Sequence, residues 1–424
     1  MKIDGYKTRI IDRKIETYLK IFGAISIEGP KWCGKTYSGR NAAKSEFLVA
    51  NPNGNFNNKQ IASLDLNIAL DGEKPHLIDE WQEIPSIWDA VRCKVDEKNT
   101  KGMFILTGST SINKSSYIHS GTGRIARLKM RPMSLYESLI SDGKISLKEI
   151  CYKKSKNVLT GEVSLDKLLD LILIGGWPAN IGLSEAEGRL VAKEYINSVL
   201  KSDIFKVDNI KRDSHKLELL LRSLARNEST TVTNSKLVKD IKDIDSEDIN
   251  IDSITSYLNL INDLYLVENL PPFSNKIRSS LRVKQSEKRH FVDPSLVCAL
   301  LNVTKEKLLS DFEFLGFVFE SLVLRDLLTY VDGFNAKLYH YQDYNNDEMD
   351  AVIELEDGEW CGVEIKLGAH QIDKAAQNLV KINNKIINKG GKSAQALIVV
   401  CGLSNAAYLR EDGVYVVPIT SLKD

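Results

Sequence analysis

The stretch that decides the fold of the first part of the chain is AISIEGPKWCGKT, residues 24–36. A short apolar run, AISIE, leads into GPKWCGKT, which satisfies the GxxxxGK[ST] pattern of a phosphate-binding loop. The pattern requires a strand before it and a helix after it, because backbone N–H groups at the helix start bind phosphate oxygens. The sequence therefore predicts a nucleotide site over residues 29–36.

Each part of this loop has an expected role. Gly29 and Gly34 let the backbone curl around the phosphates, while Lys35 reaches the β- and γ-phosphates and Thr36 offers a hydroxyl to Mg²⁺. We expect the nucleotide to be ATP, because no Asn-Lys pair in the chain belongs to an NKxD motif for guanine. The residues expected to bind it are Gly29, Pro30, Lys31, Trp32, Cys33, Gly34, Lys35 and Thr36.

Two later apolar runs end in polar residues that suit hydrolysis. HLIDEW (76–81) ends a predicted strand in Asp79 and Glu80, and MFILTGS (103–109) ends another at Thr107. We expect Asp79 to hold magnesium through water, and Glu80 to orient the attacking water. Thr107 is expected to sense the γ-phosphate. The alternation of these runs with helical stretches predicts a parallel sheet.

The segment GTGRIARLKMRP (121–132) offers arginines that could neutralise charge on the transferred phosphoryl group. Arg124 is the preferred candidate, ahead of Arg127 and Arg131, because it follows the glycines directly. A surface arginine with no catalytic role is the alternative.

Composition narrows the classes of protein. A chain of 424 residues is longer than the chains that usually fold around a single hydrophobic core, so several domains are expected. The 57 basic and 57 acidic residues cancel, so no overall field attracts nucleic acid or membrane. The six cysteines form no CxxC pair, which argues against zinc and a disulfide framework. We find neither a signal peptide nor an apolar run of about 18 residues, and expect a cytoplasmic protein without a membrane partner.

The middle of the chain has helical periodicity. Residues 164–205 suggest a small helical lid, and three further helical patterns followed by a likely hairpin suggest a winged helix-turn-helix. The third pattern consists of Ile251, Ile254, Leu258, Ile261 and Leu264. The hairpin segment 275–290 carries six Lys or Arg residues, but the acidic stretch 239–252 would repel phosphate. DNA binding and packing against protein both remain open.

Near the C-terminus, carboxylates and a lysine lie in two predicted strands. Asp350 lies in MDAVIEL, while Glu364 and Lys366 lie in VEIKL, where alternate residues share a face. Two carboxylates such as Asp350 and Glu364 could bind Mg²⁺, and the lysine could position or deprotonate water for attack on a phosphodiester. The alternative is a Glu-Lys pair on a solvent-exposed face.

Several motifs together resemble a known family. GPKWCGKT, LIDEWQEIP, LTGSTS and GTGRIARLKMRPMSLYE, in this order, resemble prokaryotic predicted AAA+ superfamily ATPases that carry a C-terminal domain of unknown function. The resemblance covers almost the whole chain. It implies that Gly29, Lys35 and Thr36 form the Walker A motif, that Asp79 and Glu80 form Walker B, and that Thr107 is the first sensor.

The C-terminal constellation resembles the PD-(D/E)xK nuclease superfamily. This resemblance adds Glu320, on the preceding helix, as the acid of the first helix, and Gln377 as a weaker match on the following helix. It implies catalytic roles for Glu320, Asp350, Glu364 and Lys366. Folds of this kind also serve without chemistry.

We therefore expect an α/β protein of four parts. These are an AAA+-like P-loop NTPase core with a parallel sheet (residues 1–160), a helical lid or linker (161–211), a winged helix-turn-helix domain (212–292) and a restriction-endonuclease-like α/β domain (305–424). Two functions stay open: an ATPase that gates a Mg²⁺-dependent nuclease acting on DNA, and a nucleotide-controlled module whose inactive nuclease-like domain docks DNA or protein. DNA, another protein and a second copy of the chain are the candidate partners besides ATP.

Overall fold

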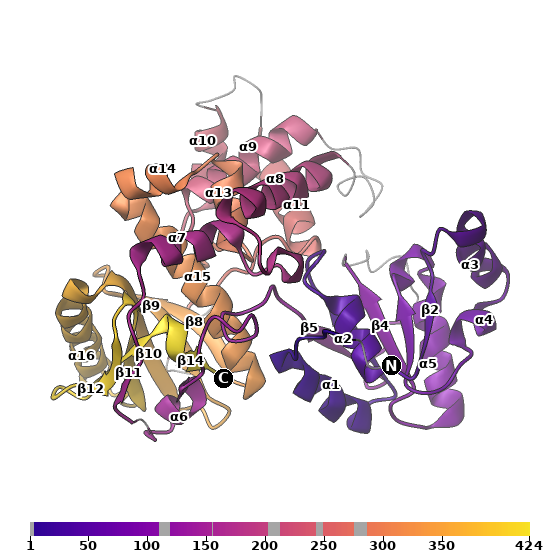
Figure 1. The fold of residues 1–424 in the computed structure, drawn as a ribbon, viewed down its shortest axis with the longest axis horizontal. Coiled ribbons are helices and arrows are strands. Elements are labelled where there is room, and N and C mark those ends of the chain that lie inside the picture. The colour runs from indigo at the N-terminus through magenta and orange to yellow at the C-terminus, as the bar shows by residue number, and fades with distance from the viewer. Residues whose placement is uncertain (1–3, 110–118, 155, 202–212, 243–248, 275–285) are drawn as a thin grey trace. The chain divides into compact units, whose positions relative to one another are not determined.

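The computed structural model describes residues 4–109, 119–154, 156–201, 213–242, 249–274 and 286–424 (Figure 1). The chain divides into two compact units. Unit 1 consists of Met1–Pro132, Ser202–Arg212 and Asn259–Leu266, and unit 2 of Met133–Lys201, Asp213–Leu258 and Val267–Asp424. The expected core of residues 1–160 therefore extends past the first segment of unit 1, and the division into four domains stays a prediction.

Unit 1 contains the predicted parallel sheet. Its described residues form five strands in the order β2-β3-β4-β1-β5, and every neighbouring pair is parallel. The strands are β1 (Ala24–Glu28), β2 (Ser45–Leu48), β3 (His76–Asp79), β4 (Phe104–Gly108) and β5 (Ile125–Lys129). The carboxyl ends of parallel strands lie at one edge, so the residues that follow β1, β3 and β4 come together there.

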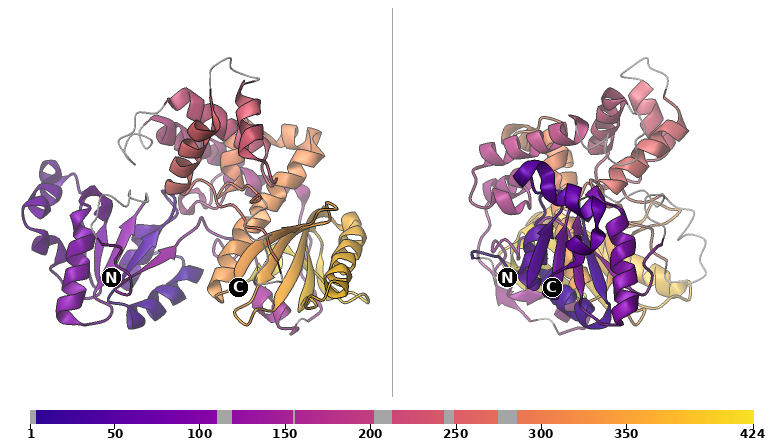
Figure 2. Two further views of the ribbon diagram at one scale, coloured as in Figure 1. Left: turned by 180° about the vertical axis from the view of Figure 1, so that it is seen from behind. Right: turned by 90° about the vertical axis from the view of Figure 1, so that its right-hand side faces the viewer.

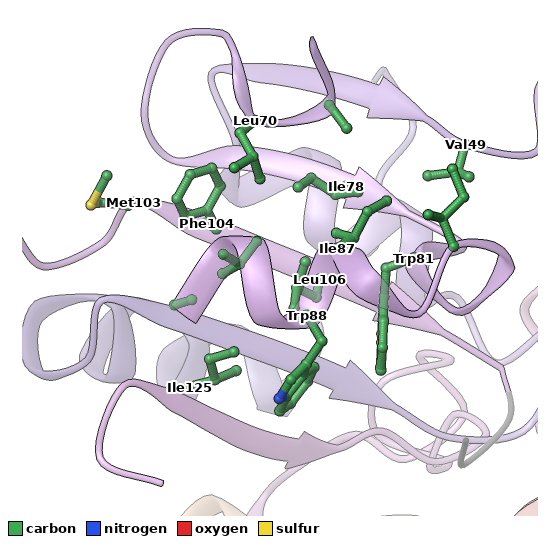
Figure 3. Close-up of a cluster of buried hydrophobic side chains, with 14 of the residues drawn as sticks. Val49, Leu70, Ile78, Trp81, Ile87, Trp88, Met103, Phe104, Leu106 and Ile125 are labelled. Atoms are coloured by element: carbon green, nitrogen blue, oxygen red, sulfur yellow. The ribbon is translucent and has the colours of Figure 1, made fainter. Parts of the chain in front are cut away.

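Helices cover both faces of this sheet. They are α1 (Ile10–Ile21), α2 (Lys35–Ala42), α3 (Asn53–Leu64), α4 (Leu66–Leu70) and α5 (Ser86–Lys98), with the short turn η1 (Trp81–Glu83). Successive strand residues point to opposite faces. Accordingly Ile105 packs in the core that includes α1, whereas Phe104 and Leu106 pack with Trp88 of α5 (Figure 3). The sheet is thus buried on both sides, as its apolar strands predict.

The larger sheet belongs to unit 2, with strand order β7-β12-β13-β11-β10-β9-β8. Its strands are β7 (Val158–Leu159), β8 (Lys337–Gln342), β9 (Glu348–Glu354), β10 (Trp360–Gly368), β11 (Ala396–Leu403), β12 (Ala406–Leu409) and β13 (Val414–Pro418). Strands β8, β9 and β10 are antiparallel, while β10, β11 and β13 run parallel. A separate pair joins β6 (Ile145–Ser146) to β14 (Leu422–Lys423).

Two helices sandwich this second sheet (Figure 2). Leu379 of α16 (Ile372–Asn388) packs in one core with Cys401 of β11. The next residue, Gly402, lies against Phe319 of α15 (Phe312–Gly333). Since neighbouring strand residues face opposite ways, α15 and α16 cover opposite faces.

Most of the remaining described helices come from the middle of the chain. They are α6 (Leu147–Cys151), α7 (Leu165–Ile174), α8 (Glu185–Lys201), α9 (Ser214–Arg226), α10 (Asn234–Lys242), α11 (Ile251–Asp263), α13 (Pro294–Leu300) and α14 (Lys305–Ser310), with short turns η3 (Pro178–Asn180), η5 (Ala369–Gln371) and η6 (Ile419–Ser421). The three predicted helical patterns correspond to α9, α10 and α11, although Ile251 is half exposed at the start of its helix. No described helix is long and apolar enough to cross a membrane.

Antiparallel bridges join the two segments of the expected hairpin. Val267 pairs with Phe291 and Leu270 with Lys288. The basic tip of that hairpin, residues 275–285, and part of the acidic stretch, residues 243–248, lie outside the described residues. The winged-helix assignment therefore stays a prediction.

A buried ion-pair network fastens α15 to distant segments of unit 2. Arg325 forms ion pairs with Asp293 at 3.0 Å and with Asp326 at 2.8 Å. Asp293 also accepts the backbone N–H of Gly176, and Asp326 accepts that of Leu135. Both carboxylates are fully buried, so each one satisfies backbone donors that would otherwise be costly to bury.

Candidate functional site

The phosphate loop, residues 29–36, adopts a conformation that requires glycine. Gly29 has φ +155° and Gly34 has φ +104°. A Cβ added to Gly29 would lie 2.1 Å from the carbonyl oxygen of Met130, far closer than two such atoms can approach. Trp32 also has a positive φ of +64°, and its side chain is 56% exposed. This tight curl follows β1 directly, as the sequence predicts.

Lys35 begins α2, and its side chain folds back over the loop. Its Nζ donates to the carbonyl oxygens of Gly29 at 2.9 Å and Pro30 at 2.7 Å. Cys33 is buried, and its carbonyl accepts a 2.8 Å hydrogen bond from Arg9. The loop is thus held from within by Lys35 and from outside by Arg9.

Three predicted residues meet beside the loop. The hydroxyl of Thr36 donates to Oδ1 of Asp79 at 2.9 Å, and the hydroxyl of Thr107 donates to the same oxygen at 2.5 Å. Asp79 and Thr107 are direct neighbours in the pairing of β3 with β4. The ends of two adjacent strands and the start of α2 therefore converge on one carboxylate.

Glu80 follows Asp79 in a left-handed conformation, with φ +55°. Burial raises the pKa of the Glu80 carboxyl, and the neighbouring charge of Asp79 raises it further. The side-chain amide of Gln82 donates a hydrogen bond to Glu80. Gln82 is a site residue that the strand-end pattern does not predict, although it lies only two residues after Glu80 in DEWQE.

The preferred arginine lies away from the loop, so the prediction for Arg124 needs correction. Ile125 pairs with Ala24, the first residue of β1, whereas the loop begins five residues later at Gly29. At about 3.3 Å per residue, that separation is about 16 Å. Arg124 instead pairs with Asp96 at 2.8 Å.

The other two arginines lie nearer the loop along β5. Arg127 pairs with Glu28 at 2.7 Å and lies over the ring of Trp88. Arg131 follows the end of β5 that pairs with Glu28. By position along β5, Arg127 and Arg131 are therefore both closer to the loop than Arg124.

In unit 2, the structure brings Asp350, Glu364 and Lys366 together with Glu320 into what we call the acidic site. Lys366 lies 3.0 Å from Oδ2 of Asp350 and 2.6 Å from Oε2 of Glu364. Glu364 is only 3% exposed, so the alternative of a solvent-facing Glu-Lys pair is wrong.

Two residues of the acidic site were missed. Lys288 forms an ion pair with Glu320, and its Nζ lies 3.7 Å from Oδ1 of Asp350. Asn378 donates a 2.8 Å hydrogen bond to Oε1 of Glu364, whereas the predicted Gln377 is exposed. A shift of one residue along α16 would have identified Asn378, but nothing in the local sequence marks Lys288.

Burial and charge set the pKa values in the acidic site. Burial raises the pKa of Glu320 to about 8 and that of Glu364 to about 8. Asp350 is also buried, but the charges of Lys366 and Lys288 hold the pKa of its carboxyl below the usual range. The carboxylates of Glu320 and Asp350 in turn raise the pKa of Lys288 despite its burial.

The two sites differ in how well they suit a divalent cation. Beside the loop, the oxygens of Thr36 and Asp79 converge, and Mg²⁺ prefers such oxygen ligands. In the acidic site, two lysines already occupy the carboxylates, and the described residues contain no group of three His, Cys, Asp or Glu residues that could hold a metal. As arranged, Asp350 and Glu364 therefore do not fit the predicted Mg²⁺ site.

Family models match three parts of the chain. Residues 22–139 match an AAA domain, residues 165–307 a domain of unknown function (DUF8612), and residues 315–422 a second domain of unknown function (DUF4143). No curated protein matches the chain. The AAA match includes the phosphate loop and all the predicted strands of unit 1, and supports ATP binding and hydrolysis by this part of the chain.

Solved structures show only distant similarity. A Walker-type ATPase of Pyrococcus abyssi has a TM-score of 0.41 and 13% identity, with 68% of this chain and 94% of that chain covered. The replication initiator DnaA, bound to AMPPCP and single-stranded DNA, has a TM-score of 0.26 and 10% identity, with 60% and 86% covered. A signal-transduction ATPase with a tetratricopeptide repeat sensor, from Pyrococcus horikoshii, has a TM-score of 0.20 and 12% identity, with 79% and 48% covered. Scores this low establish no common fold.

Proposed function

We propose that the chain binds ATP together with Mg²⁺ and hydrolyses it at the phosphate loop. The observation that carries this proposal is the convergence of the Thr36 and Thr107 hydroxyls on one oxygen of Asp79. It joins the loop to the ends of β3 and β4, where a triphosphate bound by the loop would end. The AAA match over the same residues supports it independently.

Each residue of this site has a separate proposed role. Thr36 and Asp79 would hold Mg²⁺, whose chemistry is to neutralise charge on the phosphate oxygens. Lys35 exchanges its two carbonyl partners for phosphate oxygens. Thr107 keeps the Asp79 carboxylate in place.

Glu80 is proposed to accept the proton of the attacking water. The raised pKa of Glu80 makes its carboxylate a stronger proton acceptor near neutral pH, which suits a general base. The hydrogen bond from Gln82 fixes the orientation of that carboxyl. The left-handed backbone at Glu80 is strain of the kind that often marks functional residues.

Nucleotide titration and phosphate release on the full chain test this proposal. Lys35→Ala should weaken ATP binding at least tenfold. Glu80→Gln should leave binding intact and slow hydrolysis by about 100-fold or more, the usual contribution of a general base. Glu83→Gln, three residues away and paired with Lys59, is the matched control and should stay near wild type. Absence of ATP binding by the wild-type chain would overturn the proposal.

We further propose that the nucleotide state controls unit 2. Tyr265 of unit 1 donates a 2.9 Å hydrogen bond to Glu28, the residue before the loop. It follows α11, a continuous helix that begins in unit 2 and ends in unit 1. Hydrogen exchange of α11 should therefore change when ATP binds, and Tyr265→Phe should reduce that change. No difference between the free and the ATP-bound chain would contradict such control.

The acidic site supports two candidate outputs. The order of strands β8, β9 and β10, followed by α16 and β11, with Asp350 on β9 and Glu364 on β10, favours a nuclease-like fold that either cleaves DNA or docks DNA, a protein or a second copy of the chain. Incubation with plasmid, ATP and Mg²⁺ separates the two. Cleavage by the wild type that is lost in Lys366→Ala supports a nuclease, whereas equal inertness supports a docking module.

All six cysteines are free, which fits the proposed cytoplasmic location.

A further inference from the structure

The acidic site contains a cation that neither family resemblance assigns. Lys288 lies far along the chain from the N-terminal motifs and 32 residues before Glu320, yet its ammonium group pairs with Glu320 and approaches Asp350 at 3.7 Å. The side chains of Lys288, Glu320 and Asp350 are all at most 10% exposed. Such a buried ammonium group requires carboxylate partners, because an unpaired buried charge is strongly unfavourable.

Five of the six carboxylate oxygens of Glu320, Asp350 and Glu364 already have partners. Asp350 directs Oδ1 at Lys288, and its Oδ2 accepts both the backbone N–H of Ile365 at 2.7 Å and Lys366 at 3.0 Å. Glu364 binds Lys366 with one oxygen and Asn378 with the other. A divalent cation could enter between Glu320 and Asp350 only by displacing Lys288.

Lys288 is also held firmly by its backbone. Its N–H donates to the carbonyl of Leu270, and its own carbonyl accepts from the N–H of Leu270, each at 2.9 Å. The bridge between Lys288 and Leu270 therefore fixes the backbone from which the ammonium group reaches the acidic site. Glu320 comes from α15 and Asp350 from β9, so a single cation joins three elements of unit 2.

We propose that the ammonium group of Lys288 takes the place of a divalent cation in the acidic site, so that the site binds no Mg²⁺ while Lys288 is in place. A lysine and a divalent metal compete for the same oxygens, and the lysine has the advantage of being covalently tethered. The inference does not depend on ATP hydrolysis, and it favours the docking output proposed above over cleavage.

Titration of the nucleotide-free full chain with Mn²⁺, followed by electron paramagnetic resonance of the free ion, tests this inference. Lys288→Met removes the ammonium group but keeps much of the apolar stem. It should bind Mn²⁺ at least tenfold more tightly than the wild type, and Lys288→Met/Asp350→Asn should lose that gain. Lys337→Met, which changes an exposed lysine at the start of β8, is the control and should bind as the wild type does.

The outcomes separate clearly. A folded Lys288→Met chain with no gain in Mn²⁺ binding overturns the inference. A wild-type chain that loses a bound Mn²⁺ ion on Glu320→Gln substitution also overturns it, and this comparison remains decisive even if Lys288→Met fails to fold. Neither result depends on ATP binding, so the ATPase proposal stands or falls separately.

Discussion

The hydroxyl of Thr107 donates a 2.5 Å hydrogen bond to Oδ1 of Asp79, on the strand next to its own. Thr107 is 1% exposed, whereas Asp79 is partly exposed. Because Thr36 donates to the same oxygen, a change in the position of either hydroxyl alters what Asp79 can hold. The sensing role expected for Thr107 thus has a direct physical route through Asp79.

Replacing Thr107 by Val should slow ATP hydrolysis while leaving ATP affinity within about threefold. The variant keeps the shape of the side chain but removes the donor to Asp79. A hydrogen bond to a charged acceptor contributes about 1.5–3 kcal/mol, so we expect a decrease of roughly 10- to 100-fold. Thr107→Ser, which keeps the hydroxyl, should retain most activity in the same phosphate-release assay. Equal activity of Val and Ser variants would exclude this role.

Gly29→Ala should abolish nucleotide binding. The new Cβ would meet the carbonyl of Met130 at 2.1 Å, so the loop must open to accept it. Gly123→Ala provides a control in the same unit, because Gly123 also has a positive φ (+79°) but no atom within 4 Å of the added Cβ. The control should lose about 1–2 kcal/mol of stability for its left-handed backbone and still bind ATP. Calorimetric titration with ATP distinguishes the two variants. Retained ATP affinity in Gly29→Ala would show that the loop does not bind the phosphates as proposed.

The stability of the chain should depend on pH through Glu228. Burial raises the pKa of its carboxyl to about 8, and the nearby charge of Glu320 contributes, although Lys288 and the N–H of Phe291 oppose the shift. Between the ordinary value of 4.5 and about 8, the folded chain holds a proton that the unfolded chain has released. The free energy of unfolding therefore falls as pH rises through this window and levels off above it.

The substitution Glu228→Gln should remove this dependence. Measured by urea denaturation, its stability relative to wild type should increase by roughly 2 to 4 kcal/mol between pH 5 and pH 8.5. The exposed Glu287→Gln should show no such change. A constant difference between Glu228→Gln and wild type across this range would show that Glu228 does not titrate as proposed.

Arg325→Met should be among the most destabilising single changes in unit 2. It leaves the buried carboxylates of Asp293 and Asp326 without their cation, which typically costs about 3–5 kcal/mol. Arg222→Met breaks an exposed pair with Glu218 within α9 and should cost less than about 1 kcal/mol. Chemical denaturation measures both, and similar losses for the two variants would contradict the difference in burial.

Local patterns predicted three strands of unit 1 and the polar residues at their ends, which the structure brings together beside residues 29–36. The phosphate loop, β3 and β4 each combine a buried apolar run with a polar end, and these signals lie within a few residues. Strand β2 was missed because its four residues are only partly buried, and β5 because charged residues interrupt it. For unit 1, the resemblance to AAA+ ATPases added roles for residues already found, whereas in unit 2 the nuclease resemblance added Glu320 as a position.

Tertiary placement accounts for the errors. Arg124 follows the glycines in sequence, but the register of β5 against β1 sets it at the far edge of the sheet. The segment around Lys288 has the composition of a solvent-exposed basic hairpin, and only contact with Glu320 and Asp350 shows otherwise. Asn378 was missed because the rotation of α16 about its axis decides which neighbour faces Glu364. None of these contacts can be predicted from a short stretch of the sequence, because each depends on residues far apart in the chain.

Strand β4 contributes both to the hydrophobic cores of unit 1 and to the candidate nucleotide site. Phe104 and Leu106 fill one core, Ile105 fills the other, and Thr107 reaches the carboxylate beside the loop. Genetic screens for heat-sensitive alleles should accordingly recover lesions here more often than in the peripheral β2, and revertants should arise at the packing partners on α1 and α5. The four consecutive codons for residues 104–107 would then report on folding and on catalysis in a single phenotype.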